Sequence, residues 1–138
     1  MRYLETSFLL GLIVKKPLVT YPFCEKLYED IKAKRLSTGL SLLTIFEIVY
    51  TLQRREKWNR DKIITTLSKL IKELKPKILN VEDGETLQKV LSTWQKYKEE
   101  MFNDVLHYFV MKKHGISDIY SIDEHFDVFP DIKRVVGE

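Results

Sequence analysis

Short apolar segments alternate along the chain with longer segments whose apolar residues recur at helical spacing. Five short segments predict β-strands, at residues 2–4, 40–43, 78–81, 119–122 and 132–136. Helices are predicted at residues 8–14, 21–36, 44–55, 59–74, 84–101 and 103–114. Because the strand segments lack alternating polarity, they predict a parallel sheet that is buried on both faces. The pattern therefore predicts an α/β protein.

Two of the predicted helices differ in their pattern. In the segment 59–74 the apolar residues share one face, and they are Ile63, Ile64, Leu67, Leu70, Ile71 and Leu74. Pro76 ends this helix. The segment 103–114 is apolar on nearly every face, which predicts a helix buried between the sheet and a further layer.

The composition is typical of one domain spanning residues 1–138. Apolar residues make up 44% and charged residues 31%, which excludes a disordered chain. The single cysteine, Cys24, cannot form an intramolecular disulfide, so we expect a reducing compartment. Since no apolar run reaches the roughly 18 to 20 residues that cross a bilayer, we expect a cytoplasmic protein without a membrane segment.

Four acidic residues stand where a parallel sheet places its functional sites. Glu5 follows the first strand, Glu47 lies in the turn of helix after the second, and Asp123 follows the fourth. Asp104 begins the apolar helix. Carboxylates held close together raise one another's pKa, so such a cluster needs a cation. Oxygen ligands suit Mg²⁺ or Mn²⁺.

Each of these acids also has a purely structural explanation. Thr44-x-x-Glu47 and Ser121-x-x-Glu124 both match the capping box, in which the acidic side chain bonds to the first backbone amide of a helix. Asp104 could stabilise the positive end of its helix. Capping or solvation is the better explanation for each acid taken singly, whereas the set of four favours a site.

Four motifs, in this order, resemble those of PIN-domain ribonucleases. They are Tyr3-Leu4-Glu5-Thr6-Ser7, the lone Glu47, Asn103-Asp104-Val105-Leu106, and Tyr120-Ser121-Ile122-Asp123-Glu124-His125-Phe126. The resemblance spans the chain and implies a three-layer α/β/α fold with a central parallel sheet of four to five strands. The length is similar to that of VapC-type toxins, which implies a toxin–antitoxin pair, with an antitoxin partner and a homodimer.

The resemblance also implies a reaction. Glu5, Glu47, Asp104 and Asp123 would hold one or two Mg²⁺ or Mn²⁺ ions that activate water to hydrolyse an RNA phosphodiester, with Thr6 and Ser121 in support. The family usually has Asp where this chain has Glu5. The extra methylene moves the carboxylate about 1.5 Å further from the backbone, which would weaken the site, favour Mn²⁺, or indicate a protein that binds RNA without cutting it.

Basic residues gather in the middle of the chain, although the net charge of +3 does not by itself indicate nucleic-acid binding. Arg54 and Arg55 are the nearest cations in sequence to the helix of Glu47 and are the candidate RNA contacts, with a solvated helix face as the alternative. Packing or helix capping is the favoured interpretation of the three histidines, His107, His114 and His125.

Three hypotheses follow. The leading one is a metal-dependent endoribonuclease of PIN type, the toxin of a toxin–antitoxin pair. The second is a catalytically silent PIN-like module that binds RNA or a protein partner, which Glu5 favours. The third is an unrelated α/β domain in which the four acids are only helix caps and lie far apart.

Overall fold

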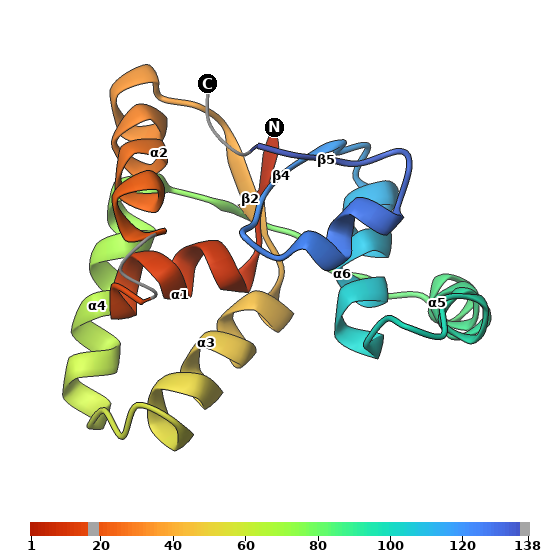
Figure 1. Ribbon diagram of the computed structural model, residues 1–138, viewed down its shortest axis with the longest axis horizontal. Helices are drawn as coiled ribbons and strands as arrows, with labels where there is room; N and C mark the ends of the chain where they lie inside the picture. The colour runs from red at the N-terminus through yellow and green to blue at the C-terminus, as the bar shows by residue number, and fades with distance from the viewer. Residues whose placement is uncertain (17–19, 136–138) are drawn as a thin grey trace.

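Five short strands form one parallel sheet at the centre of the computed structural model, which describes residues 1–16 and 20–135 (Figure 1). The strands are β1 (Arg2–Leu4), β2 (Thr38–Leu40), β3 (Lys77–Ile78), β4 (Asp118–Tyr120) and β5 (Lys133–Arg134). Their order in the sheet is β3-β2-β1-β4-β5, and every neighbouring pair is parallel. The predicted parallel sheet is confirmed, with β1 as its central strand.

Helices cover both faces of this sheet (Figure 1). They are α1 (Thr6–Val14), α2 (Tyr21–Lys34), α3 (Leu42–Arg54), α4 (Arg60–Leu74), α5 (Gly84–Lys96), α6 (Phe102–Lys113) and the short 3-10 helix η1 (Glu124–Val128). Buried residues of α1 to α4 form one apolar cluster, and those of α5, α6 and η1 form another. The expected three-layer α/β/α fold is therefore confirmed.

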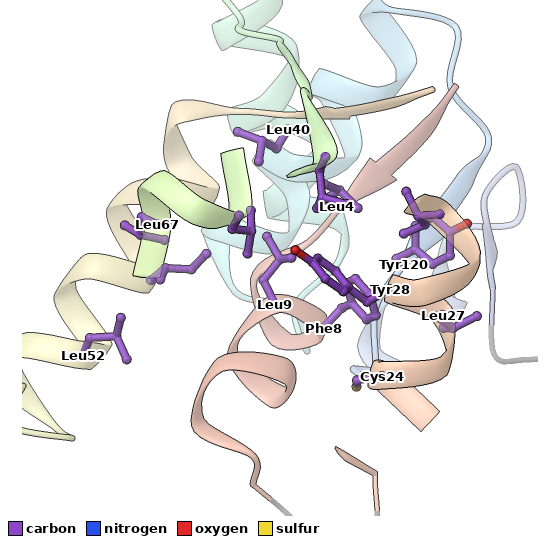
Figure 2. Close-up of a cluster of buried hydrophobic side chains, with 14 of the residues drawn as sticks. Leu4, Phe8, Leu9, Cys24, Leu27, Tyr28, Leu40, Leu52, Leu67 and Tyr120 are labelled. Carbon is purple, nitrogen blue, oxygen red and sulfur yellow. The ribbon is translucent and has the colours of Figure 1, made fainter. Parts of the chain in front are cut away.

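The two clusters meet the sheet through alternate residues of its strands. Leu4 belongs to the cluster under α1 to α4, where Figure 2 shows it near Leu9 and Leu40. Its neighbour Tyr3 is fully buried in the opposite cluster, with α6. Successive strand residues face opposite sides, so β1 contributes to both cores.

The predicted strand 40–43 ends earlier than expected, at Leu40. Ser41 is the N-cap of α3, and its hydroxyl accepts a hydrogen bond from the Thr44 amide, so Leu42 already lies in the helix. The capping box proposed for Thr44 and Glu47 is therefore wrong. Apolar residues at the start of an amphipathic helix resemble a strand when only four positions are considered.

Other boundaries differ for similar reasons. The strands predicted at 78–81, 119–122 and 132–136 are observed as β3, β4 and β5, and residue 136 lies outside the described residues. The helix predicted to reach Met101 ends at Lys96, and Met101 precedes α6 instead. Within the described ranges, no helix is long and apolar enough to cross a membrane.

Candidate active site at the carboxyl ends of the strands

Two of the predicted acids, Glu5 and Asp123, follow β1 and β4, which are neighbours in the sheet. Leu4 of β1 pairs with Tyr120 of β4, so Glu5 and Ser121 leave the sheet side by side. Asp123 follows two residues later, whereas Glu47 lies within α3 and Asp104 in the first turn of α6. Asp104 interacts electrostatically with Asp123 and Glu5, and His107 interacts with both Glu5 and Glu47, so the four acids lie near the carboxyl edge of β1, β2 and β4, where parallel sheets carry their sites. Among the described residues, however, no three of these acids have ligand atoms within 4.8 Å of one another.

Glu5 is buried, with 5% of its surface exposed, and it is the N-cap of α1. Its Oε2 accepts hydrogen bonds from the Ser7 amide at 3.0 Å, from the Ser7 hydroxyl, and from Ser121 Oγ at 2.7 Å. Burial raises the pKa of Glu5, and the three donors together with His107 offset only part of this rise. Ionisation of Glu5 is therefore unfavourable, and a nearby cation would offset this.

Ser121 does not cap a helix with Glu124. Its hydroxyl donates to Glu5 and accepts the Asp123 amide at 3.0 Å, while Asp123 itself caps η1 by accepting the His125 amide at 2.9 Å. The capping box proposed for Ser121 and Glu124 is therefore wrong. Ser121 instead joins the segment after β4 to the segment after β1.

Glu47 has hydrogen-bond partners on both carboxylate oxygens. Thr6 Oγ1 donates to Oε1 at 2.7 Å, and Asn103 Nδ2 donates to Oε2 at 2.9 Å. His107 Nε2 lies 2.6 Å from Oε1. Burial alone would raise the pKa of Glu47, but the bonds from His107, Asn103 and Thr6 outweigh it and lower the pKa. Glu47 is thus held as a carboxylate by three other side chains.

His107 carries a buried positive charge. Its side chain is fully buried, Nδ1 lies 2.6 Å from the Tyr3 hydroxyl, and that hydroxyl donates to Ser41 Oγ at 2.9 Å. When the Tyr3 hydroxyl donates to Ser41, it accepts from Nδ1, and Nε2 donates to Glu47, so both ring nitrogens are protonated in this arrangement. Burial lowers the pKa of His107, but the Tyr3 oxygen and the Glu47 carboxylate raise it to about 10.

Packing accounts for the burial of His107 but not for its hydrogen bonds, so the favoured interpretation of this residue is incomplete. Asn103 and His107 are four residues apart and therefore share one face of α6, and both contact Glu47. That spacing, next to Asp104, is the signal in the sequence that indicates a site residue. His114 is the C-cap residue of α6, as capping predicts.

Asp104 lies in a field of negative charge. Burial, then the nearby Asp123 and Glu5, raise its pKa to about 6, although His107 opposes this rise. Glu5, Asp104 and Asp123 offer carboxylate oxygens, the donors that Mg²⁺ and Mn²⁺ prefer. Burial is the largest cause of the raised pKa of both Glu5 and Asp104, and neighbouring carboxylates add to the rise for Asp104. The chemical type of these donors fits a hard divalent cation.

A cavity of about 370 Å³ opens beside Glu47. It is lined by Thr6, Phe46, Glu47, Tyr50, Thr51, Arg55 and Asn103. Of the two predicted RNA contacts, Arg55 lines this cavity, whereas Arg54 is exposed but does not. A cation, two exposed aromatic rings and the polar residues around Glu47 thus border one space.

Solved structures with this fold include three proteins of low sequence identity. VapC20 of Mycobacterium tuberculosis, a toxin that cleaves the sarcin-ricin loop, is 16% identical with a TM-score of 0.72, and the match covers 94% of this chain and 95% of that one. VapBC2 of Rickettsia felis, bound to a DNA fragment from its promoter, is 15% identical with a TM-score of 0.71 and covers 97% of both chains. PAE2754 of Pyrobaculum aerophilum is 18% identical with a TM-score of 0.66, and covers 98% of this chain and 90% of that one.

These likenesses establish the fold. None of the curated proteins matches this sequence. The PIN domain family model, however, matches residues 2–132, which is nearly the whole chain. On this match, the chain belongs to the PIN domain family.

Proposed function

We propose that this protein is a divalent-metal-dependent endoribonuclease and the toxin of a VapBC-type toxin–antitoxin system. The observation that carries the proposal is the position of Glu5, Asp104 and Asp123 near the carboxyl edge of the sheet, where burial raises the pKa of Glu5 and of Asp104, and Asp123 and Glu5 raise that of Asp104 further. Membership of the PIN domain family and the likeness to VapC20, a toxin that cleaves the sarcin-ricin loop, support it. Perturbed pKa values such as that of Asp104 are typical of functional sites.

Glu5, Glu47, Asp104 and Asp123 are the proposed ligands and catalytic residues for one or two Mg²⁺ or Mn²⁺ ions. When bound, such an ion lowers the pKa of water and neutralises charge on the leaving oxygen of the phosphodiester. Ser121 orients Glu5, and Thr6 orients Glu47, through the hydrogen bonds described above. His107 keeps Glu47 ionised and fixed in place.

The proposed path of the RNA runs along the cavity beside Glu47. Arg55 would contact a phosphate there, and Arg54 would add a weaker contact from the exposed surface of α3. Both contacts are independent of base sequence, because a phosphate is the same at every nucleotide.

An antitoxin partner and a homodimer in the cytoplasm belong to the same proposal. Leu42, Phe46 and Tyr50 repeat every four residues along α3, and each has more than half of its surface exposed. Exposed apolar side chains in such a row are typical of a surface that another protein covers. The Rickettsia felis VapBC2 structure supports a partner protein by likeness.

The test is cleavage of single-stranded RNA by the purified protein with Mg²⁺, with Mn²⁺ and with EDTA. We expect cleavage only with metal, and a loss of at least about 100-fold in Asp104→Asn, which removes a charge but preserves the shape. Asp61→Asn is the matched control, because Asp61 is the exposed acid in the first turn of α4. It should cleave like the wild type.

A folded protein that cuts no RNA with either metal, once any antitoxin is removed, would overturn this proposal. The favoured function would then be a silent PIN-like module that binds RNA or a protein. One observation favours that second function: Glu5 replaces the family's usual Asp, and its Oε2 is already bonded to Ser7 and Ser121. Restored cleavage in Glu5→Asp would support it.

A further inference from the structure

Beside the four acids lies a second group of side chains that could bind a cation. Among the described residues, only Glu100, Asp104 and His125 form a group of three His, Cys, Asp or Glu ligands whose ligand atoms all lie within 4.8 Å of one another. Neither Glu100 nor His125 belongs to the proposed four-acid site, and Asp104 lies in both groups. No single segment provides this group, because it joins the loop before α6, the first turn of α6 and η1.

Glu100 supplies an independent sign of a missing partner. Its side chain is 6% exposed, and its Oε2 is fully buried without a hydrogen-bond partner. His125 Nδ1 lies 3.3 Å from this oxygen but does not complete a hydrogen bond with it. Buried carboxylate oxygens without partners are rare in proteins, because the lost hydration is costly. A cation bound between Glu100 and His125 would give Oε2 of Glu100 the partner that it lacks.

The backbone holds these side chains in place before any ion binds. The Glu100 amide donates to the Tyr97 carbonyl at 3.0 Å, and the Trp94 indole donates to the Glu100 carbonyl at 2.9 Å. Asp123 fixes the backbone of His125 by accepting its amide at 2.9 Å. A preformed group of ligands loses little conformational entropy on binding.

We propose that Glu100, Asp104 and His125 bind a divalent transition-metal ion, at a site that adjoins the four-acid site and shares Asp104 with it. One imidazole nitrogen and two carboxylates suit Zn²⁺ or Mn²⁺ better than Mg²⁺, which prefers oxygen ligands and its own water. His125 is 60% exposed, so this group of side chains is open to solvent on the side of the ring. Three protein ligands and an open side are typical of a site that accepts a further ligand, not of a closed structural zinc site.

A plain ion pair between protonated His125 and Glu100 is the competing explanation. It would leave the Asp104 carboxylate, whose oxygen lies within 4.8 Å of both ligand atoms, without a cation of its own. It would also leave Oε2 of Glu100 poorly bonded, since the ring nitrogen is not aligned with it. A divalent cation neutralises both carboxylates at once.

The test uses the full chain without an affinity tag and needs no RNA. Nitrogen NMR resolves the three histidine rings, and Zn²⁺ is added stepwise. We expect the Nδ1 resonance of His125 to shift as Zn²⁺ is added, and the shift to be complete at about one equivalent of Zn²⁺. Mg²⁺ should leave this resonance unchanged. Calorimetry should give Zn²⁺ binding at least tenfold weaker in His125→Ala and in Glu100→Gln. His114→Ala, which removes the exposed histidine at the end of α6, is the control and should bind like the wild type.

Two results would overturn the proposal. Equal Zn²⁺ affinity in the wild type, His125→Ala and Glu100→Gln would mean that Glu100 and His125 form only an ion pair. Loss of the His125 shift in Glu5→Gln would mean that the ion belongs to the four-acid site. Because binding is measured without RNA, failure of the nuclease proposal would leave this measurement unaffected.

Discussion

The acids at the carboxyl edge of the sheet divide into two regions that the protein treats in opposite ways. Glu47 is bonded to Thr6 and Asn103 and lies against the buried cation of His107, so its pKa is lowered. His107 also lowers the pKa of Glu5 and of Asp104, but burial outweighs it, and the pKa of each is raised. The chain thus neutralises one carboxylate itself and leaves the others to an external charge.

This difference suggests a division of roles within one site. A carboxylate that is tied by three side chains cannot move far, so Glu47 is suited to holding a fixed position. Carboxylates that repel one another make the empty site unfavourable and increase its affinity for a divalent cation. Stability without metal and affinity for metal therefore oppose each other here.

The largest effect is expected when the imidazole of His107, the internal counter-ion of Glu47, is removed. His107→Leu would leave Glu47 without its counter-ion and the Tyr3 hydroxyl without a donor. We expect the free energy of unfolding in urea to fall by about 3 kcal/mol, as for other broken buried ion pairs. Glu47→Leu in the same chain should recover part of this loss. A fall of less than about 1 kcal/mol would contradict a buried ion pair between His107 and Glu47.

The second test removes the repulsion in the other region. In EDTA at pH 7.5, Asp104→Asn should be more stable than the wild type by about 1–2 kcal/mol, allowing for solvent screening. In the folded chain the pKa of Asp104 is raised from 3.8 to about 6. The folded state therefore loses stability as the pH rises from about 4 to 6, and the penalty is complete above that range.

The stabilising effect of Asn should accordingly vanish near pH 4, where Asp104 is protonated in the folded state. Urea unfolding at several pH values measures this dependence. Asp61→Asn, at an exposed acid at the start of α4, is the control for removal of a surface charge. Destabilisation by Asp104→Asn at pH 7.5 would contradict the proposed charge repulsion.

The smallest expected effect concerns RNA and sharpens the contrast between neighbouring arginines. Arg55 lines the cavity beside Glu47, and Arg54 does not. In an Asp104→Asn background that prevents cleavage, Arg55→Ala should weaken binding of single-stranded RNA about threefold at moderate salt, and Arg54→Ala less than that. Fluorescence anisotropy at two salt concentrations checks this. Equal losses in both variants would argue against a path through the cavity.

Most of the fold could be predicted from the sequence. Short apolar segments without alternation indicate buried parallel strands, and the observed sheet confirms them. The boundaries were less predictable, because Ser41 begins α3 immediately after β2, and Leu42 is apolar in either structure. Three or four residues do not distinguish a strand from the first turn of a helix.

The sequence predicts a site residue reliably only where its position directly after a strand is enough to place it at the sheet edge. Glu5 and Asp123 follow strands, so their gathering at one edge follows from parallel pairing. His107 was not predictable in the same way, since one histidine in an apolar helix resembles core. Its role depends on Tyr3 facing α6, and on Tyr3 reaching Ser41 across the sheet edge. Glu100 carries no motif, and only the turn before α6 brings it to Asp104.

The alternation of Tyr3, Leu4 and Glu5 makes the start of the chain intolerant of insertions and deletions. Three consecutive residues serve one core, the other core and the proposed metal site. A deletion of one residue here would shift each side chain to the opposite face and place a carboxylate in an apolar layer. Variation in the length of related chains is therefore expected before β1 or in the loops, and not between Arg2 and Ser7.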